Sequence, residues 1–113
     1  MDRIYIGDLK NYTGQEVTIK GGVDVRRDHG KLIFIDLRDR SGKVQMVALP
    51  NREEAHKIAD TVRSEWVLAV TGLVNKRPEK MVNEQVLNGD IEVEITGIEV
   101  LSEAKKLPFE LIM

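Results

Sequence analysis

Two adjacent glycines, Gly21 and Gly22, interrupt a stretch in which apolar and polar residues alternate. Residues 17–26 read VTIKGGVDVR, and the apolar residues that share one phase are Val17, Ile19, Val23 and Val25. Such alternation is typical of a strand with one buried face. Paired glycines inside a strand usually mark a bulge or a sharp bend. We therefore expect a long first strand that curls and can serve two parts of one sheet.

Four further strands and one helix are expected after this strand. Residues 32–39 and 43–48 alternate on either side of a short turn, residues 91–101 alternate again, and residues 66–74 form a nearly continuous apolar run. Between the third and fourth strands, helical spacing links Ala55, Ile58, Ala59 and Val62. We expect a helix of about three turns there, with Asn51 as its N-cap and Glu54 as the capping-box partner.

This order of elements predicts an all-β chain with one helix, namely a five-stranded Greek-key barrel with the helix between the third and fourth strands. That arrangement is the OB-fold. With 113 residues, of which 42% are hydrophobic, the chain suits a single domain with one core. We expect a lead-in at residues 1–15 with a turn of helix, a polar loop at residues 75–89, and an apolar tail at residues 107–113.

Composition argues against several classes of function. The chain has no cysteine and two histidines far apart in sequence, and it contains no phosphate-binding glycine loop, so we expect no catalytic residues, metal site or cofactor. No apolar run approaches the roughly 20 residues that span a bilayer, and the N-terminus does not resemble a signal peptide. We expect a cytoplasmic protein. Because the net charge is only -2, nucleic-acid binding would have to depend on a local patch.

Such a patch is predicted on the second and third strands. Alternation turns Ile33, Ile35 and Leu37 inward, which leaves Phe34 outward with Leu32, Asp36 and Arg38. In the third strand it turns Val44, Met46 and Ala48 inward and leaves Lys43, Gln45 and Val47 outward. The short turn makes the strands antiparallel neighbours. We therefore expect Phe34 and Gln45 to lie close together on one open surface.

Basic residues surround this pair in the sequence: Arg26, Arg27, His29, Lys31, Arg38, Arg40 and Lys43. An aromatic ring can stack on an unpaired base, a glutamine amide can pair with the edge of a base, and cations attract phosphates. In OB-folds, these strands form much of the binding face. The pattern therefore indicates single-stranded nucleic acid as the ligand. The alternative is that a loop or a neighbouring domain covers Phe34.

Several motifs resemble those of a known family. They are RRDHG, IFIDLRD with the VQ pair that follows it, VTGLVNKRPE, GDIEV and LPF near the end. Together they resemble the N-terminal anticodon-binding domain of bacterial aspartyl-tRNA synthetase. The resemblance implies that Phe34 stacks on the central anticodon base, uracil, that Gln45 reads its edge, and that Arg27 contacts the anticodon. It also implies that Glu92 lies near the first anticodon base and Arg77 near the anticodon stem-loop.

The resemblance also implies partners. They are the anticodon stem-loop of aspartate tRNA and, in the parent enzyme, a catalytic domain and a second subunit. Because the catalytic domain is missing from this chain, we expect no aminoacylation. Gly22 stands where the family has a tryptophan, and we expect that exchange to cost a few kcal/mol if the tryptophan is packed, unless nearby changes compensate.

Two other functions remain as alternatives. A nuclease-like site could use Asp36 and Asp39, but their opposite parity on the strand separates them, and Arg38 and Arg40 would repel a metal ion. Salt-bridged strand charges are the favoured interpretation of these residues. The other alternative is a free-standing or engineered OB-fold scaffold that binds another protein or single-stranded nucleic acid.

Overall fold

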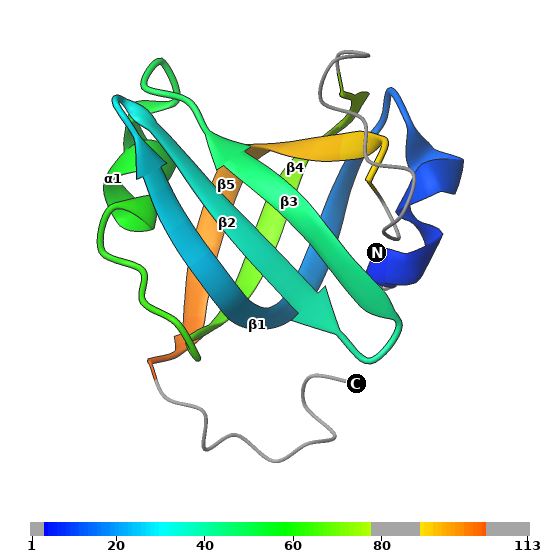
Figure 1. Cartoon of the computed structure of the whole chain (residues 1–113), viewed down its shortest axis with the longest axis horizontal. Helices are drawn as coiled ribbons and strands as arrows, with labels where there is room; N and C mark the ends of the chain where they lie inside the picture. Colours follow the sequence, from blue (N-terminus) through cyan, green and yellow to red (C-terminus); the bar gives the residue numbers. More distant parts are fainter. Residues whose placement is uncertain (1–3, 78–88, 104–113) are drawn as a thin grey trace.

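The first strand, β1, pairs with two different strands, and the rest of the barrel depends on this. The computed structural model describes residues 4–77 and 89–103. The first half of β1 (Glu16–His29) is antiparallel to β4 (Val67–Lys76), and its second half is antiparallel to β2 (Leu32–Asp39). Gly22 lies at the crossover, opposite Val67 on one side and Arg38 on the other. Figure 1 shows β1 curving strongly as it passes from one partner to the other. The elements are η1 (Ile6–Tyr12), β1 (Glu16–His29), β2 (Leu32–Asp39), β3 (Gly42–Ala48), α1 (Glu53–Ala59), β4 (Val67–Lys76) and β5 (Ile91–Ser102).

The five strands form a closed barrel in the order β1-β2-β3-β5-β4, as Figure 1 shows. All neighbouring strands are antiparallel except β3 and β5, which run parallel and pair only at Met46 with Val93 and at Val47 with Glu94. The helix α1 lies between β3 and β4 in the chain and contacts β5, β2 and β3. The predicted OB-fold is therefore confirmed, together with a short helix, η1, before β1.

The bend of β1 requires a glycine at position 21. A Cβ atom on Gly21 would overlap the carbonyl oxygen of Arg38 in β2, so only glycine lets the two backbones approach this closely. Gly22 is different, because a Cβ atom there would meet only the carbonyl oxygen of Trp66, at 3.9 Å. Gly22 lies in the outward phase and is half-buried, so a side chain at this position would point away from the core.

A bulge lies just beyond the glycines and corrects one prediction. The register of β1 on β2 shifts between Val23 and Val25, because Asp24 is an extra residue. Alternation is therefore displaced by one position, and Val25 pairs with outward-facing Asp36. The prediction that Val25 points inward is wrong: the residue is 39% exposed.

Val47 lies in the outward phase, as predicted, yet it is only 5% exposed. Val47 lies opposite Phe34 in β2 and opposite Glu94 in β5. Because β3 is paired on both sides at this point, side chains of both neighbouring strands flank Val47. The residues of β2 and β3 that were predicted to point inward are all buried.

The helix is shorter than expected and begins one residue later. It spans Glu53–Ala59, two turns rather than three, and its N-cap is Arg52, which makes no side-chain capping bond. The prediction that Asn51 caps the helix is therefore wrong. The side chain of Arg52 instead bonds to Glu94 of β5, at 2.9 and 3.2 Å. After Ala59 the chain continues in tighter turns, with backbone bonds from Thr61 to Ile58 and from Val62 to Ala59.

The core is filled from the barrel wall and from both helices. Ile6 and Leu9 of η1 are fully buried, as are Ala59 of α1 and Val62 just after it. None of the helices in the described part of the chain has the length and apolar character needed to span a bilayer. Most of the predicted loop at residues 75–89 and the whole predicted tail at residues 107–113 lie outside the described residues.

The two glycines should respond oppositely to alanine. Gly21→Ala should lower the free energy of unfolding by about 2 kcal/mol or more, because the methyl group forces β1 away from β2. Gly22→Ala should raise it by about 0.5 kcal/mol, because alanine loses less conformational entropy and fits the open position. Urea denaturation of both variants measures the difference. Equal destabilisation would show that the bend needs both glycines.

Candidate nucleic-acid interface

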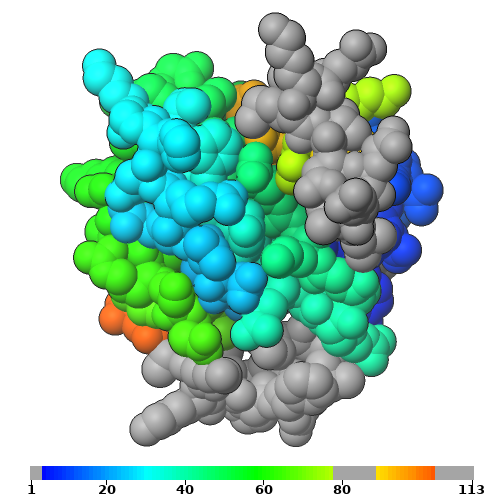
Figure 2. Space-filling model, viewed as in Figure 1, coloured from blue at the N-terminus to red at the C-terminus, as the bar shows by residue number. Residues whose placement is uncertain are grey.

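Phe34 lies on the outer face of the barrel, as predicted. Its chain neighbours Ile33 and Ile35 are buried, whereas Phe34 itself is half-buried. The rings of His29 and Phe34 are nearly perpendicular, with 5.8 Å between their centroids and an interplanar angle of 85°. Figure 2 shows side chains of β2 and β3 on the face turned toward the viewer. The ring thus contacts His29 and is not part of the core.

Four polar side chains form a continuous hydrogen-bonded chain beside this ring. Arg27 Nη2 donates to Asp36 Oδ1 at 3.2 Å and to Gln45 Oε1 at 3.0 Å, and Gln45 Nε2 donates to Glu92 Oε2 at 2.8 Å. The residues come from β1, β2, β3 and β5, so the chain crosses four strands. We call Asp36, Arg27, Gln45 and Glu92 the outer polar chain. Phe34 adjoins it, because it is the register partner of Arg27.

The predicted basic patch is largely offset by carboxylates. Arg27 faces Asp36, while Lys43 and Arg38 lie 3.5 and 3.9 Å from Asp24, the residue at the bulge. The outer polar chain itself carries one cation and two carboxylates. The face therefore offers directed donors and acceptors more than a strong positive field. Lys31 and His29 lie exposed at the hairpin end of the face.

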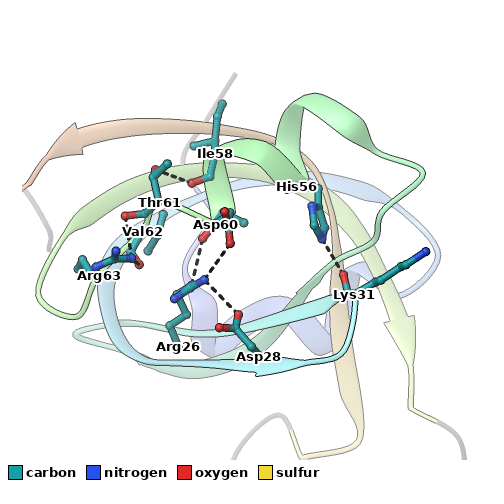
Figure 3. A network of polar contacts seen from close by, with 10 residues as sticks. Arg26, Asp28, Lys31, His56, Ile58, Asp60, Thr61, Val62 and Arg63 are labelled. Carbon is teal, nitrogen blue, oxygen red and sulfur yellow. Dashed lines mark hydrogen bonds and ion pairs between the residues drawn. The ribbon is translucent and has the colours of Figure 1, made fainter.

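The structure does not bring Arg26 to the face of Phe34. The bulge at Asp24 puts Arg26 in the inward phase, opposite Ile35. Its guanidinium reaches the end of α1, with Nε donating to the carbonyl oxygen of Ala59 at 3.2 Å and Nη2 lying 3.3 Å from Asp60 and 3.1 Å from Asp28 (Figure 3). Arg26 thus ties the hairpin to the helix.

Lys31 and Arg77 lie at the margins of the face. The backbone oxygen of Lys31 is 2.6 Å from Nε2 of His56 in α1, while the lysine side chain extends away from that contact (Figure 3). Arg77 follows β4, and its Nε donates to the carbonyl oxygen of Ile91 at 2.9 Å. Arg77 is therefore held against the start of β5, where Ile91 is the residue before Glu92.

The aspartates of the alternative nuclease-like site have structural partners. Asp36 bonds to Arg27, and Asp39 accepts bonds from the backbone of Ile6, Ser41 and Gly42. Within residues 4–77 and 89–103, no group of three or more metal-binding side chains is present. The interpretation of these residues as bonded strand charges is therefore the better supported one.

Sequence reasoning missed that Asp36 is a hydrogen-bond partner of Arg27. By simple alternation Arg26 faces outward and Arg27 inward, and the bulge at Asp24 reverses this order. The signal that could have found the partnership is the antiparallel register, since Asp36 lies directly opposite Gln45. The sequence alone does not show where the bulge lies.

A sequence profile for OB-fold nucleic acid binding domains matches residues 17–101. The chain belongs to this family. It is 50% identical over 103 residues to the aspartate–tRNA ligase of Shouchella clausii, covering 90% of this chain and 18% of the relative. It is 53% identical over 97 residues to the aspartate–tRNA(Asp/Asn) ligase of Syntrophomonas wolfei, covering 85% of this chain and 17% of the relative. These relatives confirm the predicted resemblance to aspartyl-tRNA synthetase.

This OB-fold domain spans less than a fifth of the length of those ligases. Its barrel is also similar to an OBody bound to hen egg-white lysozyme, with a TM-score of 0.76 and 20% identity, covering 89% of this chain and 94% of the other. At that identity the likeness concerns the fold alone.

Arg26 should contribute to stability. Arg26→Met keeps much of the apolar stem but removes the bonds to Ala59 and Asp60, so it should lower the free energy of unfolding by about 1 kcal/mol. Lys57→Met removes an exposed charge from the same helix and should change it by less than about 0.5 kcal/mol. Chemical denaturation compares the two. An unchanged free energy of unfolding in Arg26→Met would show that Arg26 does not stabilise the contact between the hairpin and α1.

Proposed function

We propose that this chain is a tRNA anticodon-binding module and that it reads the aspartate anticodon, GUC, on the outer face of β1, β2 and β3. One observation carries the proposal: a half-buried aromatic ring lies beside a hydrogen-bonded chain of side chains with unused donors and acceptors. Membership of the OB-fold nucleic-acid-binding family supports it, as do the ligase relatives.

Phe34 provides the stacking platform. The ring lies perpendicular to that of His29, a contact that limits its rotation, and its half-buried position leaves part of it accessible to the central anticodon base. Stacking of a base on an aromatic side chain contributes about 1–3 kcal/mol. Val47, which lies opposite Phe34 in β3, is buried, so an apolar residue flanks the platform on that strand.

Gln45 reads the edge of the same base. Its carboxamide has two N–H groups and two acceptor lone pairs, and the contacts with Arg27 and Glu92 use one of each. One donor and one acceptor remain for uracil. Arg27, which bonds to Gln45, would contact the anticodon as well. Glu92 and Arg77 lie toward β5, where the first anticodon base and the stem-loop would be bound.

The ligases to which this chain is similar are much longer than the chain. We propose that this domain binds RNA in the cytoplasm without catalysing aminoacylation, and that the ligase activity requires a catalytic domain and a second subunit. Because the outer polar chain has more carboxylates than cations, we expect moderate affinity for the isolated chain.

The alternative, a barrel that binds another protein, has less support. The OBody bound to lysozyme demonstrates that such a barrel can bind a protein. Protein interfaces are enriched in aromatic side chains at their core. Within the described residues, the exposed large hydrophobic side chains are only Val25 and Leu101. This surface fits a single-stranded RNA better.

Titration with a GUC anticodon stem-loop tests the stacking. Phe34→Ala should weaken binding by about 1–3 kcal/mol. Phe34→Leu should lose most of the same energy, because leucine retains apolar bulk but has no π-face. Lys57→Ala, which removes one exposed charge from α1, serves as the matched control. Binding by both Phe34 variants as tight as by the control would contradict stacking.

Changing the anticodon tests the reading. Gln45→Ala should reduce discrimination at the central base more than it reduces affinity for the GUC loop. A loop with uracil at the third position should also be compared, because the relative from Syntrophomonas wolfei is named for two tRNAs. Repeating the titrations at two salt concentrations measures the phosphate contribution. Equal affinity for loops with any central base would contradict specific readout.

A further inference from the structure

The amide of Gln45 lies between two groups of opposite hydrogen-bonding character. On one side, the guanidinium of Arg27 can only donate, and its Nη2 lies 3.0 Å from Oε1. On the other side, the carboxylate of Glu92 can only accept, and its Oε2 lies 2.8 Å from Nε2. Both contacts are satisfied in only one orientation of the amide.

Reversing the amide would be doubly unfavourable. The NH₂ group would then face the guanidinium, donor against donor, and the carbonyl oxygen would face the carboxylate, acceptor against acceptor. The two contacts lie on opposite sides of the amide, so no small rotation relieves both. The outer polar chain therefore fixes the polarity of Gln45 before any ligand arrives.

Fixed polarity matters because uracil and cytosine have nearly the same shape but present opposite donor and acceptor patterns on their pairing edges. Uracil presents an N3 donor beside the O4 acceptor, and cytosine presents an N3 acceptor beside the N4 donor. At one stacked position, an amide that pairs with uracil must be turned over to pair with cytosine. An amide free to turn would accept both bases.

We propose that Arg27 and Glu92 act as a polarity lock on Gln45, which makes this site select uracil over cytosine, and that Asp36 is the positioning residue of the lock. The proposal deepens the function proposed above and rests on it.

Asp36 holds the donor side of the lock in place. The same Nη2 atom of Arg27 that bonds to Gln45 also bonds to Asp36 Oδ1 at 3.2 Å. Asp36 is directly opposite Gln45 in the register of β2 and β3, and its side chain is only 14% exposed. The long side chain of Arg27, 44% exposed, would otherwise be free to leave Gln45. Asp36 itself need not touch the RNA.

Two isosteric substitutions test the lock with GUC and GCC stem-loops. The wild-type chain should prefer uracil by about tenfold, which a well-paired two-bond contact can supply. Glu92→Gln should bring the ratio of the two dissociation constants below about threefold, because a glutamine can donate or accept and lets the amide turn. Asp36→Asn should lower the ratio as well, whereas Asp36→Glu, which keeps the carboxylate, should retain it.

Glu99→Gln is the matched control, since it removes an exposed carboxylate from the same strand, β5. It should leave the ratio unchanged. A merely structural role of Asp36 or Glu92 would weaken binding of both loops equally and leave the ratio intact, and that outcome would overturn the lock. A wild-type chain that binds neither loop would overturn the proposed function, and the selection of uracil with it.

Nuclear magnetic resonance gives a readout that needs no RNA. In the free wild-type chain, one Nε2 proton of Gln45 should be protected from exchange, because it is bonded to Glu92. The protection should be lost in Glu92→Gln and kept in Glu99→Gln. Rapid exchange of both protons in the wild type would overturn the lock even if the stem-loop binds.

Discussion

The close approach of two backbones at Gly21 is the constraint on which this barrel depends. Because no side chain separates Gly21 from the carbonyl group of Arg38, β1 can leave β4 and continue along β2 without a break. One strand thereby joins two halves of the wall. A larger residue at this position would push β2 outward, and β2 carries Phe34.

The bulge at Asp24 then decides which residues of β1 face outward. It turns Arg27 toward Phe34 and Gln45, and it turns Arg26 toward the end of α1. Two adjacent arginines therefore have different roles: one belongs to the candidate interface and the other holds the helix. Asp24 also attracts Arg38 and Lys43, so the extra residue helps to balance the charge of the face.

The alternation of apolar and polar residues was sufficient to assign side chains to faces wherever a strand is regular. In β2 the alternation of Ile33, Phe34 and Ile35 assigned their sides correctly, and the order of elements predicted the barrel. It failed for Val25, because a bulge adds a residue without a distinctive sequence. It did not show that Val47 is covered, because burial there depends on β5, which lies more than forty residues later. The length of α1 was overestimated because apolar spacing continues into the turns after Ala59.

The candidate interface was predictable only in part. The strand pattern supplied Phe34, Gln45 and Arg27, and the resemblance added Glu92, but neither shows how side chains bond to one another. The bonds from Gln45 to Arg27 and Glu92 join residues from three strands, and only the assembled barrel brings them together. The motif IFIDLRD contains Asp36, but only the register shows that this residue lies beside Gln45 on the outer face.

The parallel pairing of β3 with β5 extends over only two residue pairs, so it is the shortest junction between neighbouring strands of the described barrel. The bond between Gln45 and Glu92 lies directly next to it. Native proteins open locally where few backbone bonds hold two segments together. An RNA that contacted both of these side chains would hold β3 and β5 together. Its binding would then make the whole barrel more rigid and raise its melting temperature.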